Sequence, residues 1–317
     1  MSLFVLGSFV VSCSAKVTAF PRAGESLRAR ALTVEPGGKG FNQAVGARRL
    51  GAEVDGLLAV GDDLFGQFAQ AAVAQADLPS AMLRQYPAKT GAGVGFINTR
   101  GENCLAVHPG ANLELSAADV AACAAQISRA AITLAQFEIA DAPIIEAFRL
   151  ARAAGASTLL NPSPLRPLDP QLWESTSILV VNAIEAAQLA ASLGGDDDAP
   201  LRPPTTRDEA TAIARRLLAL GGGPEIVIIT LGPGGAIARQ RDQSPIYQDA
   251  FQVDGVVDTL GAGDAFIAAL AVSFHESRSL ESSLRRACAS GALVASRTGV
   301  FTALPTAQEL QRFLSRT

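Results

Sequence analysis

Short apolar runs alternate with alanine-rich segments of helical length along most of this chain of 317 residues. The runs are brief and bounded by turn residues, which is typical of buried β-strands; they cover residues 4–10, 56–60, 131–136, 157–160, 178–181 and 226–230. The segments between them predict helices at 42–50, 64–75, 117–127, 142–154, 184–193 and 208–220. This order predicts an α/β fold in three layers, a sandwich in which helices cover both faces of a mostly parallel central sheet.

Two stretches break this pattern. Residues 17–34 and 91–108 alternate apolar with polar residues and contain Gly and Asn turns, which is typical of half-exposed antiparallel strands. We expect a small separate β-sheet, built from about residues 12–36 and 90–109, that projects as a lid. The whole chain, residues 1–317, is then expected to be a single domain.

The composition argues against several classes of function. The 26 basic and 30 acidic residues give a net charge of −4, so we expect no nucleic-acid partner. No apolar run reaches the ~18–20 residues of a membrane helix, and no positive charge precedes the apolar residues 3–11 as in a signal peptide. A buried first strand in a cytoplasmic protein is therefore expected, with no membrane partner. The two histidines and four scattered cysteines are a poor supply for triads or zinc sites.

Three consecutive aspartates, residues 196–198, lie in a proline-containing stretch between two predicted helices. Adjacent carboxylates in such a stretch predict a solvent-exposed loop. A metal site is the alternative interpretation.

The first glycine cluster is Gly37-Gly38-Lys39-Gly40. A phosphate-binding Walker A loop needs Ser or Thr after the lysine, and a dinucleotide fingerprint directly follows the first strand, so neither fits. We interpret the cluster as the start of a helix where the backbone passes close to another group. Lys39 then either contacts an anion or sugar or lies in a purely structural turn.

The second cluster, residues 258–264, leads into an apolar helix over 265–274. Gly261 and Gly263 let the backbone approach a ligand, and the free N–H groups at a helix start bind anions. Asp264 in the first turn has two interpretations: it caps the helix, or it takes a proton from a hydroxyl while the amides hold a phosphate.

Two further polar segments follow predicted strands. Thr230 to Gly235 is a glycine-rich turn at the end of a strand, where open α/β sheets bind ligands, although entry into a hairpin explains it equally well. Asn182 and Glu185 follow another strand, in a position to place Mg²⁺ or phosphate.

Taken together, residues 37–44 and 258–264 resemble the two signature motifs of the ribokinase-like (PfkB) carbohydrate kinases. Further matching segments occur in the family's order at residues 5–8, 21–25, 61–66, 110–112 and 161–162. The resemblance covers essentially the whole chain and is nearest to the ribose kinases of that family.

The resemblance implies ATP-dependent phosphorylation of a sugar hydroxyl. By similarity, Asp264 is the base, and the amides of Gly261, Ala262 and Gly263 form an anion hole. The positions that match the sugar site are Ser12, Gly38, Lys39, Asn42, Glu138 and Asp264. The positions that match the ATP and Mg²⁺ site are Asn182, Glu185, Thr230, Gly232, Gly235, Gly263 and Cys288. The projecting strands match the family's lid, which also pairs subunits, so a homodimer through the lid is expected.

A monovalent-cation loop is also implied. Asp258, with the backbone carbonyls near Leu260, Val294, Arg297 and Gly299, matches the family's K⁺ loop. Ala303 departs from it, because a hydroxyl side chain stands there in the ribose kinases.

The sugar site departs from the ribose kinases at two positions. They carry an Asn and an Asp that reach ribose hydroxyls where this chain has Val10 and Ser12. The expected acceptor is therefore D-ribose or a related sugar, and the loss of such hydrogen bonds favours an acceptor that lacks a hydroxyl there or carries an apolar group. Phe9 and Phe41 either favour a larger acceptor such as a nucleoside or pack in the core.

Other functions stay open beside a sugar kinase. A nucleoside kinase uses the same scaffold, and a sugar-phosphate kinase would need basic lid residues such as Arg28 or Arg30. A catalytically silent sugar- or nucleotide-binding regulator is a further alternative, against which the retained Asp264 and Lys39 argue.

Overall fold

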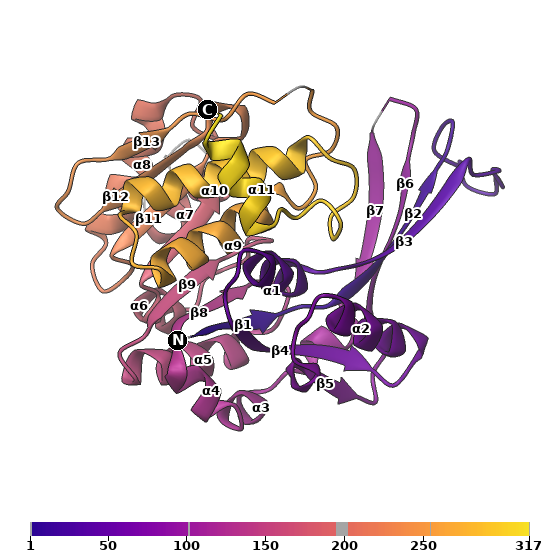
Figure 1. The fold of residues 1–317 in the computed structure, drawn as a ribbon, viewed down its shortest axis with the longest axis horizontal. Helices are drawn as coiled ribbons and strands as arrows, with labels where there is room; N and C mark the ends of the chain where they lie inside the picture. The colour runs from indigo at the N-terminus through magenta and orange to yellow at the C-terminus, as the bar shows by residue number, and fades with distance from the viewer. Residues whose placement is uncertain (1, 101, 195–201, 254, 317) are drawn as a thin grey trace.

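The computed structural model of the chain describes residues 2–100, 102–194, 202–253 and 255–316. These residues contain a nine-stranded central sheet whose strands from β11 to β5 all run parallel, while β12 and β13 are antiparallel to their neighbours (Figure 1). The predicted mostly parallel sheet is therefore confirmed. In spatial order the strands are β13 (Ile246–Gln248), β12 (Ala236–Gln240), β11 (Ile226–Thr230), β10 (Ile178–Asn182), β9 (Ser157–Asn161), β8 (Ala130–Gln136), β1 (Ser2–Gly7), β4 (Val54–Gly61) and β5 (Leu83–Tyr86).

Helices cover both faces of this sheet. Alternation along β1 sends Leu3 and Val5 into one hydrophobic core and Phe4 and Leu6 into the other, as the period of two in a strand requires. The first core is covered by α1 (Lys39–Arg49), α2 (Leu64–Gln75), α9 (Ala262–His275), α10 (Leu280–Ala295) and α11 (Ala307–Leu314). The second is covered by α3 (Ala117–Ala121), α4 (Ala124–Arg129), α5 (Asp141–Ala153), α6 (Pro170–Ser175), α7 (Ala183–Gly194) and α8 (Arg207–Ala219). Within the described ranges, every helix is too short or too polar to cross a membrane.

A second sheet of four strands projects away from the helices and the central sheet, as Figure 1 shows. Its order is β3 (Ala31–Gly37), β2 (Val10–Lys16), β6 (Gly91–Ile97) and β7 (Asn103–His108). The separate sheet predicted from the sequence is confirmed, and we call it the lid.

The lid differs from the expectation in two respects. Its central pair, β2 and β6, is parallel rather than antiparallel. Residues 17–30, all of which the structure describes, contain no strand, because Pro21 lacks an amide donor and a turn joins Arg22 to Glu25.

Two predicted elements are divided in the structure. The apolar run 4–10 does not form one strand: β1 ends at Gly7 and β2 begins at Val10. The side chain of Asn112 holds the break, because it accepts a hydrogen bond from the Phe9 amide at 3.0 Å and donates one to the Phe9 carbonyl at 2.8 Å. The predicted helix 117–127 is likewise two short helices, α3 and α4, with a tighter turn at Cys123.

The order in which successive strands are added to the sheet reverses beside β1, although the strands stay parallel. The neighbours of β1 are β4 on one side and β8 on the other, and the later strands spread outward from each. Open α/β sheets bind ligands outside the carboxyl ends of the strands at such a switch point. Ser8, which follows β1, and Glu138, which follows β8, lie at this edge.

Candidate active site

The start of α1 is pressed against the end of β1. A methyl group on Gly38, whose φ is +97°, would lie 2.8 Å from the Ser8 carbonyl oxygen, and one on Gly40 would lie 2.6 Å from the Ser8 nitrogen. The Phe41 amide donates to the same Ser8 carbonyl at 3.0 Å. These glycines are therefore required by close backbone approach, as the sequence predicted.

Asp264 lies in the first turn of α9, where it is buried against α1. Asn42 Nδ2 donates to Asp264 Oδ2 at 2.8 Å, and Gln43 Nε2 donates to Oδ1 at 3.1 Å. The helix N-cap is Gly261, and no side chain caps this helix. The capping interpretation of Asp264 is therefore wrong, and its carboxylate is oriented by side chains of another helix.

Burial makes this carboxylate more basic. Desolvation raises the pKa of Asp264 above its ordinary value, and the nearby Glu138 carboxylate raises it further. The Lys39 ammonium and the amides of Asn42 and Gln43 lower the pKa, but burial is the largest contribution. A carboxylate with a raised pKa is a better acceptor for the proton of a hydroxyl.

A second amide supports the first. Gln136 Nε2 donates to Gln43 Oε1 at 2.6 Å, and both side chains are fully buried. The hydrogen bond from Gln136 therefore fixes the orientation of the Gln43 amide, with its Nε2 toward Asp264. Sequence reasoning missed the role of Gln136, for which the signal was a polar residue at the end of an otherwise apolar strand.

Removing this donor gives a testable change in pH dependence. The Gln43→Met variant keeps side-chain bulk but loses the hydrogen bond that stabilises ionised Asp264, so the pKa of Asp264 rises further. We expect the acid limb of the kcat/KM–pH profile to move to higher pH in this variant, while Gln75→Met on the exposed side of α2 leaves it in place. An unmoved limb in Gln43→Met would show that Gln43 does not act on the base.

Gly38, Lys39, Asn42 and Glu138 are brought together with Asp264. The backbone amide of Lys39 donates to Glu138 Oε2 at 2.9 Å, and the hydroxyl of Ser8 donates to the same oxygen. The Lys39 and Glu138 charges both act on Asp264. The predicted sugar-site residues therefore gather at the carboxyl ends of β1 and β8, with Ser8 as a member that the sequence did not indicate.

Ser12 is the exception in the predicted sugar site. It lies on lid strand β2, directly opposite Glu35 of β3, and no hydrogen bond connects it to the residues around Asp264 within the described chain. Phe9 and Phe41 are fully buried, with their rings edge to face at a centroid distance of 5.2 Å. They pack in the core, which is the second of the two interpretations above.

The turn before α9 leaves its backbone open. Gly261 has a φ of +78°, and a methyl group on it would lie 2.6 Å from Val300 Cγ1. A methyl group on Gly263 would meet no atom within 4 Å. In the described part of the chain the amides of Gly261 and Gly263 have no backbone partner, whereas the Ala262 amide donates to the Thr259 carbonyl at 3.2 Å. The helix start therefore presents two free amides beside Asp264.

The predicted nucleotide-site residues lie farther along the same sheet edge. Asn182 and Thr230 are directly opposite each other at the ends of β10 and β11. The Asn182 amide donates to Glu185 Oε2 and the Glu185 amide donates to Asn182 Oδ1, each at 2.9 Å, so this pair fixes the start of α7.

The glycine-rich turn after β11 enters a hairpin. Gly232 and Gly235 both have positive φ, and the turn joins β11 to the antiparallel β12. A methyl group on Gly235 would lie 2.0 Å from the Gln248 carbonyl oxygen, so the fold itself requires this glycine. Cys288 is buried in α10, where desolvation raises the pKa of its thiol to about 12 and keeps it neutral.

The predicted cation loop is partly satisfied by the protein itself. Asp258 Oδ1 accepts from the Leu260 amide at 3.0 Å, and the Val294 carbonyl accepts from the Arg297 amide at 2.9 Å. The Arg297 guanidinium donates to the Ala303 carbonyl at 3.1 Å. Gly299 has a positive φ in the same loop.

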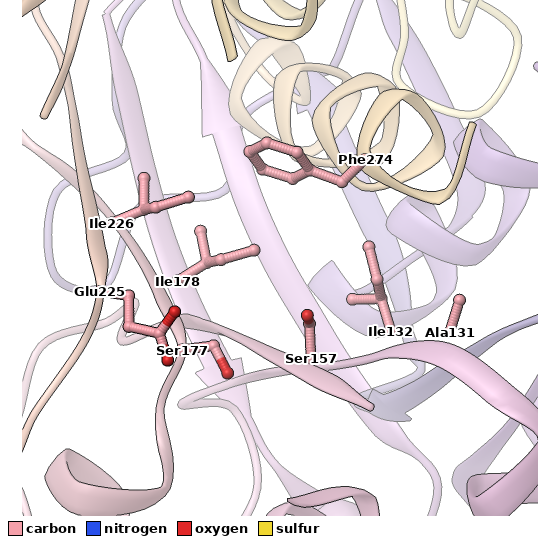
Figure 2. A pocket seen from close by; sticks show the side chains of 8 residues that line it. All are labelled: Ala131, Ile132, Ser157, Ser177, Ile178, Glu225, Ile226 and Phe274. Atoms are coloured by element: carbon pink, nitrogen blue, oxygen red, sulfur yellow. The ribbon is translucent and has the colours of Figure 1, made fainter. Parts of the chain in front are cut away.

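Other candidate sites in the molecule are weaker. The aspartates 196–198 lie outside the described residues, and in the part of the chain that is described no three His, Cys, Asp or Glu side chains gather as a metal site. A cavity of about 220 Å³ lies at the amino ends of β8 to β11, below Phe274 of α9 (Figure 2). Two of its three polar residues, Ser177 and Glu225, already contact Arg152, at 2.9 and 3.9 Å. None of the predicted site residues lines it.

The fold and the site together define an α/β enzyme with a lid and a buried carboxylate beside a helix start whose first amides are open. A family model described as "pfkB family carbohydrate kinase" matches residues 1–307. The chain belongs to this family, and it is a carbohydrate kinase.

Several relatives match over their whole length. A ribokinase of Mus musculus is 32% identical over 98% of this chain and 93% of its own. A deoxyribokinase of Salmonella typhi is 30% identical over 99% of both. The structure of Arabidopsis thaliana ribokinase in complex with ribose and ATP superposes with a TM-score of 0.88 and 26% identity, covering 99% of this chain and 98% of that one.

Proposed function

We propose that this carbohydrate kinase transfers the γ-phosphoryl group of ATP to a hydroxyl of a small sugar, with D-ribose or a related sugar as the acceptor. The observation that carries the proposal is the position of Asp264. Its buried carboxylate is oriented by Asn42 and Gln43 and lies one residue from the open amide of Gly263.

The chemistry follows from this arrangement. The acceptor oxygen forms a bond to the γ-phosphorus while the bond between that phosphorus and the β,γ-bridging oxygen breaks, and ADP leaves. Asp264 takes the proton that the hydroxyl loses. The amides of Gly261 and Gly263 hold the negative oxygens, and Ala262 contributes only if its bond to Thr259 opens. Lys39 and Glu138 orient the acceptor.

Asn182, Glu185, Thr230, Gly232, Gly235 and Cys288 are our proposed nucleotide side. The absence of any protein atom within 4 Å of a methyl group placed on Gly263 supports a phosphate position beside them. The carboxylate of Glu185 suits Mg²⁺, because one of its oxygens accepts from the Asn182 amide at the start of α7 and the other has no partner among the described residues. When bound, the ion would neutralise phosphate charge. K⁺ at Asp258 is a weaker proposal, because N–H groups of Leu260 and Arg297 already donate to oxygen atoms in and beside that loop, which would otherwise be free to coordinate the ion.

The acceptor is proposed from two positions. Val10 offers no hydrogen bond where ribose kinases carry an amide, so a sugar that lacks a hydroxyl at that point loses nothing here. Both ribokinase and deoxyribokinase occur among the relatives, which supports testing pentoses first. A nucleoside acceptor is the alternative, but burial of Phe9 and Phe41 removes the observation that favoured it.

A panel of acceptors tests the proposal. The purified protein is assayed for ADP release with ATP and D-ribose, 2-deoxy-D-ribose, inosine, adenosine or ribose 5-phosphate. We expect the highest kcat/KM with a free pentose and a higher ratio of deoxyribose to ribose activity than in a kinase with Asn at position 10. Faster turnover of a nucleoside or a sugar phosphate than of every free sugar would contradict the proposal.

The lid supports the proposed homodimer. Leu32, Val34 and Val94 share one of its faces and are 70%, 46% and 56% exposed, so a second copy of the lid could cover them. The four cysteines form no disulfide, which agrees with the proposed cytoplasmic location.

A further inference from the structure

One acidic side chain in the lid has no structural explanation. Glu35 of β3 is the only Asp or Glu in the four lid strands, and it is half-buried. Glu is disfavoured in strands, where a pleated apolar surface is preferred. Its neighbour Val34 points to the opposite, exposed face of the lid.

Strand pairing shows which way Glu35 points. It is directly opposite Ser12 in the antiparallel pair β2–β3, so the two side chains share a face. A methyl group on Gly299 would lie 3.1 Å from Glu35 Oε1 and 3.6 Å from Oε2. The next residue, Val300, contacts Gly261 of the proposed anion hole. The face that carries Glu35 and Ser12 is therefore the face toward the active site.

The carboxylate of Glu35 lacks a donor. Throughout the described residues, no hydrogen bond or ion pair involves it. A carboxylate that no protein group holds is available to accept hydrogen bonds from the hydroxyl groups of a ligand. Ser12, across the strand, has a side chain too short to replace the carboxylate that ribose kinases carry at its position.

We propose that Glu35 is a specificity-determining residue for the acceptor, and that its carboxylate accepts hydrogen bonds from hydroxyl groups of the bound sugar. Glu35 thereby supplies from β3 the acidic group that β2 lacks at Ser12. This inference rests on the proposed sugar kinase activity. It also gives the lid a binding role, because a sugar bound to Glu35 contacts both the lid and the residues around Asp264.

Steady-state kinetics of three variants test the inference, with the best pentose from the panel as the acceptor. Glu35→Ala and Glu35→Gln are expected to raise the acceptor KM by about tenfold or more, as for the loss of a hydrogen bond to a charged group, with the KM for ATP unchanged. Ser12→Asp introduced into Glu35→Ala is expected to restore most of the acceptor affinity, because it returns a carboxylate to the same face. Glu25→Gln, which removes an exposed carboxylate from the loop between lid strands β2 and β3, is the matched control and is expected to behave as wild type.

The outcomes separate this inference from the proposed function. An unchanged acceptor KM in both Glu35 variants overturns the inference while the kinase assignment stands. This holds also if the variants change the K⁺ concentration needed for activity, which would point to the neighbouring cation loop at Gly299 instead. If the wild-type protein phosphorylates no sugar, the proposed function fails. Calorimetric titration of D-ribose and 2-deoxy-D-ribose into wild type and Glu35→Ala then decides the inference alone: weaker binding of either sugar to the variant supports it, and equal or absent binding of both overturns it.

Discussion

Asp264→Asn is expected to lower kcat by about a hundredfold or more, as for the loss of a general base. The amide of Asn cannot take the proton of the acceptor hydroxyl, whereas the proposed anion hole at the amides of Gly261 and Gly263 is unchanged. We therefore expect ATP affinity, measured by calorimetry, to change little. Near-normal turnover in this variant would refute the role of Asp264 as the base.

The same substitution is expected to stabilise the fold. The pKa of Asp264 is higher in the folded than in the unfolded protein. Ionisation of Asp264 therefore lowers the free energy of unfolding in full above the folded pKa, and this loss disappears as the pH falls below the unfolded pKa. The thermal midpoint of Asp264→Asn is expected to exceed that of wild type most at neutral pH, and the difference is expected to shrink as pH falls through that window. A midpoint below wild type at neutral pH would show that burial is not the dominant effect on this group.

Gly263→Ala is expected to lower kcat/KM for ATP on the order of a hundredfold, as when an oxyanion donor is lost. A methyl group on this residue meets no protein atom within 4 Å, and it enters the space before the free amides. Because Gly263 lies within α9, replacement by Ala is also expected to raise the free energy of unfolding by about 0.5–1 kcal/mol. Chemical denaturation and ATP kinetics measure the two effects.

Gly261→Ala is the matched comparison. At this position a methyl group collides with Val300, and the φ of +78° disfavours any side chain. This variant is expected to lose both activity and stability. If Gly263→Ala kept wild-type ATP kinetics, the space before Gly263 would not be the phosphate position.

The local pattern of the sequence was sufficient to predict the layers but not the long-range pairing. Apolar runs bounded by turns predicted the central strands, because each buries its side chains in a core on either face. Periodicity cannot say which strand lies beside which, so the parallel pairing of β2 with β6 was missed. Periodicity also does not indicate that the Asn112 side chain, 103 residues beyond Phe9 in the sequence, separates β1 from β2 by bonding to the Phe9 backbone.

The candidate site was predictable to the extent that each residue is part of a local motif. Lys39, Asn42 and Asp264 lie in glycine-rich segments whose backbone requirements are visible in the sequence. Gln136 has no such motif, and its role depends on meeting Gln43, which is 93 residues away in the chain. The proposed role of Glu35 likewise could not be predicted from the sequence, because it depends on the strand register that places Glu35 opposite Ser12.

The hydrogen bonds to Asp264 join the two ends of the chain. Its carboxylate depends on donors that precede it by 222 and 221 residues. During synthesis, α1 is complete long before α9 leaves the ribosome, and contacts of such long range close late in folding. The proposed base, Asp264, is therefore oriented only when the C-terminal helices have docked. A truncated or half-folded chain would present Asn42 and Gln43 without the carboxylate that they orient, so recovered activity is expected to report completion of the whole fold.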